Sequence, residues 1–190
     1  MFKSRLLAIT ALMFTTAACA SAPTNGSTET RVERPIALAQ VEAAQTAWCA
    51  ALVEIGRLGA TGGDAKGYAD KVLSSAYDYD NGKVLFKPTL TYGAQTFRLT
   101  KDGALAYFVG GNQAYPNDSG FALKQWVTCT PKIAGVVAQG DMAIATGNVY
   151  MTDAKGNQVM VDKTFGYLRG ADGQLRIVLH HSSLPFAPAK

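Results

Sequence analysis

The spacing of the hydrophobic residues changes once along this chain, near Gly82. Before it, residues 39–58 and 64–77 carry apolar side chains every three or four positions, which is typical of helices that bury one face. After it, apolar and polar residues alternate, as in strands with one buried side. Helices followed by a run of strands predict an α+β fold, in which the helices pack on a strongly curved, mostly antiparallel sheet that encloses a small pocket.

Seven strands are expected in the second part of the chain, several of them joined by short turns. Turn residues that include glycine predict hairpins at 101–103, 154–157 and 171–173. Pro88 predicts that the first strand is interrupted or lies at the edge of the sheet. The expected strands are residues 84–91, 94–100, 104–110, 125–133, 142–152, 158–168 and 174–181.

The first twenty residues have the pattern of a secretory signal. Basic Lys3 and Arg5 precede an apolar run, residues 6–14, that is too short for a bilayer, which needs roughly 20 residues. Two kinds of processing are open: cleavage before Ser21, or a lipobox-like ending at Cys19, which then becomes a lipidated N-terminus. Both predict export, either to a bacterial periplasm or as an outer-membrane lipoprotein that faces the periplasm.

The rest of the chain is expected to form one domain behind a flexible tether. Residues 21–38 are polar and carry proline near both ends, which is typical of a linker. Residues 39–187 then form a single α+β domain. The formal charge is 18 − 14 = +4. Without Lys3 and Arg5 it falls to 16 − 14 = +2, so the mature domain lacks the basic excess that is typical of nucleic-acid binding.

Two cysteines, Cys49 and Cys129, remain once Cys19 is assigned to the signal or the lipid anchor. An even number of cysteines in an oxidising compartment favours a disulfide, which could stabilise the fold by about 4 kcal/mol in the chain-entropy model. Two buried free thiols are the alternative. Neither cysteine has a histidine near it in the sequence, so a catalytic thiol is the least favoured interpretation.

The last expected strand ends in His180, His181, Ser182 and Ser183. Side chains alternate along a strand, so His180 and Ser182 share one face and the other two residues share the opposite face. The two neighbouring histidines therefore do not readily bind one metal ion together. Because the chain contains only two histidines, a zinc site with three histidines from one chain is excluded. A histidine at the end of a buried strand can also have a purely structural role, and this is the alternative to a catalytic role.

This C-terminal segment resembles the signature of the iota-class carbonic anhydrases, and the resemblance extends over roughly residues 40–187. The segments that carry it are residues 83–90, 97–100, 104–112, 118–123, 143–153 and 163–185. The resemblance implies a nuclear-transport-factor-2-like cone, in a superfamily that includes the association domain of calcium/calmodulin-dependent kinase II. The fold that the resemblance implies therefore agrees with the α+β fold that the spacing of the hydrophobic residues predicts.

The resemblance also implies the site residues. Thr89, Tyr107, His180 and Ser182 would be catalytic, and the three hydroxyl residues would in addition bind carbon dioxide or bicarbonate. No cofactor is expected, and zinc or manganese is the disfavoured alternative. A neutral imidazole is a suitable base at pH 7, whereas hydroxyl groups position water and donate hydrogen bonds to developing negative charge.

The sequence therefore predicts an iota-type carbonic anhydrase that interconverts carbon dioxide and bicarbonate without a metal. A homodimer is expected, with no nucleic-acid partner and no membrane contact beyond a lipid anchor. The alternative function is a non-catalytic module that binds a small ligand or drives oligomerisation, as the kinase association domain does.

Overall fold

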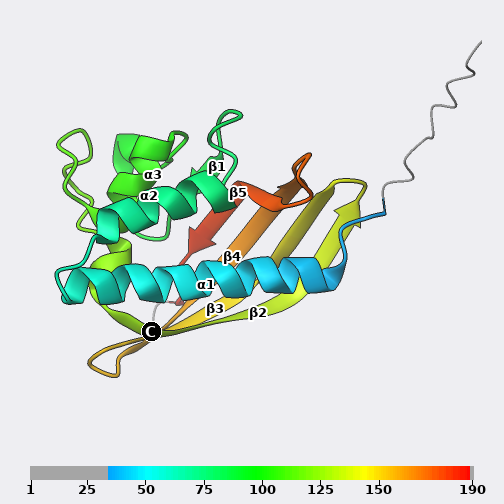
Figure 1. The fold of residues 1–190 in the computed structure, drawn as a ribbon. Coiled ribbons are helices and arrows are strands. Elements are labelled where there is room, and N and C mark those ends of the chain that lie inside the picture. The colour runs from blue at the N-terminus through cyan, green and yellow to red at the C-terminus, as the bar shows by residue number, and fades with distance from the viewer. Residues whose placement is uncertain (1–33, 189–190) are drawn as a thin grey trace, which may run out of the picture. The chain divides into compact units, whose positions relative to one another are not determined.

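A five-stranded sheet with helices packed on one face forms the domain (Figure 1). The computed structural model describes residues 34–188. The predicted signal peptide, Cys19 and most of the predicted tether thus lie outside the described residues. The helical elements are α1 (Leu38–Ala60), α2 (Ala65–Ala76), η1 (Gly93–Gln95), α3 (Lys101–Val109) and η2 (Phe121–Lys124), and the strands are β1 (Leu85–Lys87), β2 (Trp126–Gln139), β3 (Met142–Asp153), β4 (Gln158–Arg169) and β5 (Leu175–Ser183).

The strand order is β1-β5-β4-β3-β2, so β1 and β2 are the two edges and the sheet is not closed. Strand β1 runs parallel to β5, and the other three pairs are antiparallel. The α+β fold and the mostly antiparallel sheet are confirmed. The predicted hairpin turns at 154–157 and 171–173 are also present, between β3 and β4 and between β4 and β5.

Helix α1 covers the inner face of the sheet because its apolar residues repeat every three or four positions. Val41, Trp48, Leu52 and Ile55 are all buried against the core. The neighbouring Cys49 forms a disulfide with Cys129 on β2, across 80 residues of sequence. This bond ties the helix to the edge strand and removes conformations from the unfolded chain, an effect typically worth about 2–4 kcal/mol.

Two predicted strands, 94–100 and 104–110, are wrong. Residues 101–109 form helix α3, and the predicted hairpin at 101–103 is its first turn, where the Thr100 side chain accepts a hydrogen bond from the Gly103 amide. The helix is buried on several sides, since Ala104, Ala106, Tyr107 and Phe108 are at most 5% exposed. A helix that is apolar all round has no amphipathic period, and its sequence cannot be told from a buried strand.

The first and fourth predicted strands have different lengths from those expected. Strand β1 has only three residues and ends directly before Pro88, which cannot donate to a ladder. Strand β2 continues past residue 133 to Gln139, through a register shift between Ile133 and Gly135. Such a bulge keeps a strand paired while its regular alternation is broken.

Candidate active site

Strand β5 supplies the floor of the candidate site. His180 and Ser182 are each 1% exposed, whereas His181 is exposed on the opposite face, as strand alternation requires. Phe86 on β1 lies opposite His180 in the parallel ladder, and their rings stack with centroids 4.4 Å apart. Phe165 on β4 contacts the same imidazole at 4.6 Å. The histidine is therefore held in place by aromatic rings.

The segment after β1 brings a second hydroxyl to Ser182. The Thr89 and Ser182 hydroxyl oxygens are 2.6 Å apart, so one donates a hydrogen bond to the other. Lys87 donates to the backbone carbonyl of Ser182 over 2.9 Å. Residues 93 positions apart in sequence thus form one polar pair.

Helix α3 contributes the third hydroxyl, from Tyr107. The Tyr107 ring is 5% exposed, stacks on Phe121 and meets Phe86 edge-on. Its hydroxyl is buried and forms no hydrogen bond to another described residue. Burial raises the pKa of Tyr107, and the nearby Thr89 hydroxyl and backbone moderate the rise. The phenol is therefore neutral at ordinary pH.

All four sequence-predicted residues line one hollow, which is called the active-site hollow below. The side chains around it are packed so closely that no space for a water-sized sphere remains. A guest therefore needs the side chains to move apart, which makes the hollow tighter than the expected pocket. Its lining residues are Trp48, Phe86, Pro88, Thr89, Tyr107, Phe108, Phe121, Lys163, His180 and Ser182.

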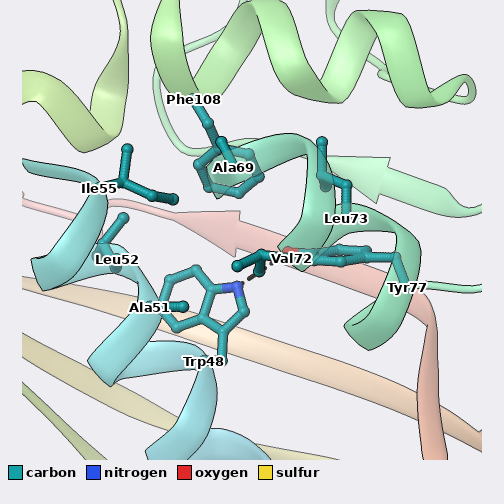
Figure 2. Close-up of a pocket in the computed structure, with 9 residues that line it drawn as sticks. All are labelled: Trp48, Ala51, Leu52, Ile55, Ala69, Val72, Leu73, Tyr77 and Phe108. Atoms are coloured by element: carbon teal, nitrogen blue, oxygen red, sulfur yellow. Dashed lines mark hydrogen bonds between the residues drawn. The ribbon is translucent and has the colours of Figure 1, made fainter. Parts of the chain in front are cut away.

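A chain of hydrogen bonds runs through His180, and we call its four residues the His180 cluster. The Trp48 indole N–H donates to the Tyr77 hydroxyl over 2.9 Å (Figure 2). The Tyr77 oxygen is also 2.9 Å from Nδ1 of His180. On the other side of the ring, Nε2 lies 2.7 Å from Nζ of Lys163. Both ring nitrogens are thus engaged within the protein.

Burial perturbs the two basic groups of this cluster. It lowers the pKa of His180 well below its usual value, and the charges of Lys163 and His181 act in the same direction. Burial also lowers the pKa of the Lys163 amine to about 7. The amine lies 4.4 Å from the centroid of the Trp48 ring, and none of the ion pairs among the described residues involves it.

Sequence reasoning missed Trp48, Tyr77 and Lys163 as site residues. For Lys163 a signal was present. On β4 the inward positions 159, 161, 163, 165 and 167 are otherwise apolar or aromatic, so a lysine stands where the alternation calls for a core residue. For Tyr77 and Trp48 the sequence offers no such sign, because both also suit an ordinary core.

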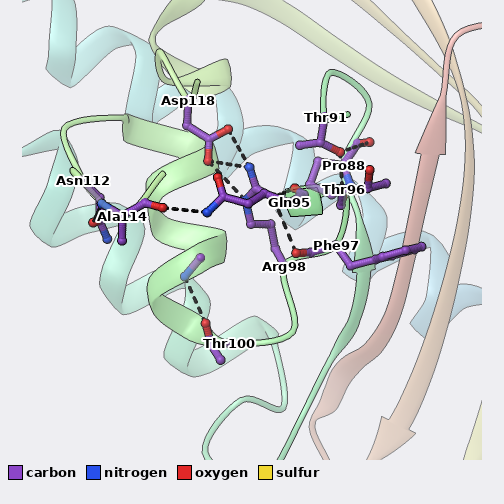
Figure 3. Close-up of polar contacts among 11 residues, drawn as sticks. Pro88, Thr91, Gln95, Thr96, Phe97, Arg98, Thr100, Asn112, Ala114 and Asp118 are labelled. Atoms are coloured by element: carbon purple, nitrogen blue, oxygen red, sulfur yellow. Dashed lines mark hydrogen bonds and ion pairs between the residues drawn. The ribbon is translucent and has the colours of Figure 1, made fainter. Parts of the chain in front are cut away.

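A buried ion pair holds the segment that carries Thr89 (Figure 3). Arg98 and Asp118 are 2% and 4% exposed, and the guanidinium donates to both carboxylate oxygens. The Arg98 amide also donates to the carbonyl of Phe86 on β1. Within the segment, the Thr91 hydroxyl bonds to the Pro88 and Thr96 carbonyls. The loop from β1 to α3 is therefore anchored at several points.

Within residues 34–188, no three His, Cys, Asp or Glu side chains lie close enough together to hold a metal ion. No helix in the same range is long and apolar enough to span a bilayer.

Comparison with known proteins identifies the family. Residues 39–184 match the pattern of metal-independent carbonic anhydrases. A metal-independent carbonic anhydrase from Nostoc sp. (strain PCC 7120) is 48% identical over 157 residues, which are 82% of this chain and 77% of the relative. The crystal structure of an iota-carbonic anhydrase from a cyanobacterium, complexed with bicarbonate, is 47% identical and has a TM-score of 0.80, with 83% of this chain and 97% of that chain covered.

A more distant structure, a nuclear-transport-factor-2-like family protein from Streptomyces avermitilis, is 18% identical with a TM-score of 0.49 and covers 78% of this chain and 96% of its own. The first two comparisons agree with the expectation of an enzyme that needs no metal. This chain belongs to the metal-independent, iota-class carbonic anhydrases.

Proposed function

We propose that the active-site hollow binds carbon dioxide and water, and that Thr89, Tyr107 and Ser182 carry the hydration to bicarbonate. One observation carries this proposal: three hydroxyl groups from a loop, a helix and a strand meet around one hollow lined by aromatic rings. Carbon dioxide is neutral and apolar, which suits such walls. Bicarbonate oxygens, in contrast, need hydrogen-bond donors.

The hydroxyl groups act on both reactants in this proposal. As water attacks the carbon atom, negative charge grows on the carbon dioxide oxygens, and donors placed in advance stabilise it. The unpaired Tyr107 hydroxyl is such a donor, and the linked Thr89 and Ser182 hydroxyls orient the water. The proton that the water loses is accepted within the His180 cluster. The similar cyanobacterial enzyme is complexed with bicarbonate, which supports bicarbonate as a ligand of this chain.

Stopped-flow carbon dioxide hydration tests the proposal directly. Purified protein should catalyse hydration equally well before and after treatment with a metal chelator, and added zinc should not raise the rate. A folded protein without activity under all these conditions would instead favour the non-catalytic binding module. Activity that disappears on chelation would leave an enzyme but refute the metal-free mechanism.

We also propose that a second copy covers the outer face of the sheet. Val137, Met142 and Ile144 are 75%, 51% and 49% exposed there, and Val137 pairs directly with Ile144 across β2 and β3. Covering this apolar area would stabilise a dimer through the hydrophobic effect. Light scattering should give twice the chain mass for the natural protein, and Ile144→Glu should give a monomer. A monomeric natural protein would refute the dimer.

For the whole chain we propose export to the periplasm, directed by residues 1–20. The basic start, the short apolar run and the small residues before Ser21 support it. If Cys19 is lipidated, the exported protein stays anchored to the outer membrane. Fractionation of cells that express the natural chain or its Cys19→Ser variant distinguishes lipid anchoring from simple cleavage. If the natural chain is lipid-anchored, the substitution should move the protein from the membrane fraction to the soluble periplasmic fraction. If it is not, both proteins should be in the soluble fraction.

A further inference from the structure

Lys163 is a buried amine at one end of the hydrogen-bond chain of the His180 cluster, and no carboxylate among the described residues pairs with it. It is 5% exposed, and its Nζ contacts Nε2 of His180 and the face of Trp48. A lysine that is buried without a carboxylate partner costs stability in its charged form. Its presence at an inward position of β4 therefore calls for a chemical reason.

Counting the hydrogen atoms of the cluster indicates the state of this amine. The Trp48 indole can only donate, so the Tyr77 oxygen accepts from it. The Tyr77 hydroxyl hydrogen then needs an acceptor, and Nδ1 of His180 is the one within reach. A neutral ring that accepts at Nδ1 carries its hydrogen on Nε2. That hydrogen is donated to Nζ of Lys163, which can accept it only as a neutral amine.

The charged form of the amine leaves one buried hydrogen unpaired. A lysine ammonium must donate to Nε2, so the ring hydrogen moves to Nδ1 and is donated to Tyr77. The Tyr77 oxygen then accepts two hydrogen bonds, and its own hydrogen has no acceptor in the cluster. The geometry thus favours neutral Lys163 before a guest binds. It also links the charge of the amine to the tautomer of His180.

The same contacts leave His180 poorly placed to act as the base. Both of its nitrogens are hydrogen-bonded within the protein, and neither is free for a water molecule. Lys163 also lines the active-site hollow and lies directly opposite Ser182 in the ladder of β4 and β5. Unlike the imidazole ring, its amine sits on a flexible stem and can turn its lone pair from Nε2 of His180 towards a guest. Side chains at such paired positions lie on the same face with Cβ atoms about 5 Å apart.

We propose that Lys163 is the base of the reaction and that His180 is a positioning residue, a role that rests on the hydration mechanism proposed above. As the water oxygen bonds to the carbon of carbon dioxide, one carbon–oxygen π bond breaks and its electron pair stays on oxygen. Nζ releases the hydrogen bond from Nε2 of His180 and turns its lone pair to the water, whose proton it accepts, so CO₂, H₂O and the amine become bicarbonate and the ammonium. The ammonium then loses its proton to solvent, and in dehydration every step is reversed.

With Lys163 as the base, the charge of the site suits first carbon dioxide and then bicarbonate. A neutral amine leaves the hollow uncharged and suited to carbon dioxide, whereas an ammonium beside bicarbonate forms an ion pair. The Trp48 face, 4.4 Å from the nitrogen, stabilises the transient cation further. In a site without metal, the lysine thus supplies the positive charge that the product anion requires.

The groups around the amine place its titration in the working range. Facing Lys163 are His180 and Ser182 from β5, Trp48 from α1, Tyr77 behind the imidazole and Tyr107 from α3. None of these groups is acidic at neutral pH, and burial alone lowers the lysine pKa to about 7. A base with this pKa is deprotonated, and able to accept a proton, at slightly alkaline pH.

The pH dependence of hydration tests the proposal. In the natural protein, kcat/KM should rise about tenfold per pH unit below pH 7 and level off above it. Lys163→Met should lower kcat/KM about 100-fold at pH 8, the scale of general-base catalysis, and remove the rise. Lys163→Arg, which keeps a permanent charge, should not restore activity. Lys132→Met, at an exposed position of β2, is the matched control and should behave like the natural protein.

A second readout does not depend on activity. The folded-state pKa lies near 7 and the unfolded value is about 10.4, so the unfolded chain binds more protons between these values. The stability of the natural protein should therefore increase from pH 7.5 to 9.5, with the folding constant from urea titration rising nearly tenfold per unit. Lys163→Met should remove this increase.

The outcomes separate the two proposals. If the natural protein hydrates carbon dioxide and Lys163→Met keeps its pH profile, Lys163 is not the base, although the proposed function stands. If the natural protein shows no hydration at any pH, the proposed function fails, and with it the catalytic role of Lys163. A pH-independent folding constant between pH 7.5 and 9.5 would show that the buried amine is not neutral, which would overturn the inference without any variant.

Discussion

Removal of single hydroxyl groups should abolish most of the hydration activity while the fold stays intact. We expect Ser182→Ala, Thr89→Val and Tyr107→Phe each to lower kcat/KM by about 100- to 1,000-fold, the range measured when one donor to a developing oxyanion is removed. The Tyr107 variant should show the clearest loss, since of these three hydroxyl groups only that of Tyr107 has no hydrogen-bond partner among the described residues. Stopped-flow hydration at pH 8 measures the effect.

The chain contains a close control for the tyrosine. Tyr167 on β4 is also buried, has a hydroxyl without a hydrogen-bond partner among the described residues and has a pKa raised by burial, but it does not line the active-site hollow. Tyr167→Phe should therefore retain full activity. Equal losses in Tyr107→Phe and Tyr167→Phe would show that the effect comes from core packing, and the hydroxyl mechanism would then be wrong.

The sequence predicts the floor of the site well because that part depends on local geometry. Strand alternation alone places His180 and Ser182 on one buried face, and the helical spacing of Trp48 and Leu52 places α1 over the sheet. Thr89 and Tyr107 could be named only through the family resemblance. Nothing in their own surroundings in the sequence distinguishes them from a turn residue and a core residue.

The contacts of the His180 cluster, which sequence reasoning missed, join segments that are apart in the sequence. Tyr77 meets His180 across 103 residues, and Lys163 meets it across 17, in a register that no local pattern encodes. The sequence of helix α3 predicts a strand because burial on several sides hides its helical period. The consequence is chemical, since only the assembled contacts show that both nitrogens of His180 are occupied.

The largest effect on stability is expected from Asp118→Asn. This change leaves the Arg98 guanidinium 2% exposed without its counter-ion, and breaking a buried pair in this way costs about 3–5 kcal/mol. The free energy of unfolding, measured by urea titration at pH 8, should fall by that amount. Because Arg98 also bonds to the Phe86 carbonyl and anchors the loop with Thr89, carbon dioxide hydration should fall as well.

The exposed pair between Asp172 and Arg176 is the matched control. Its geometry is also bidentate, but Asp172 is 48% exposed and water can replace the lost partner. Asp172→Asn should therefore leave stability almost unchanged. The double variant Arg98→Met with Asp118→Leu removes both charges and should recover much of the stability lost in Asp118→Asn, since no unpaired charge remains buried. It should not recover activity to the same extent, because the polar anchors of the loop are lost. Similar stabilities for Asp118→Asn and Asp172→Asn would contradict the view that burial makes the Arg98 pair essential.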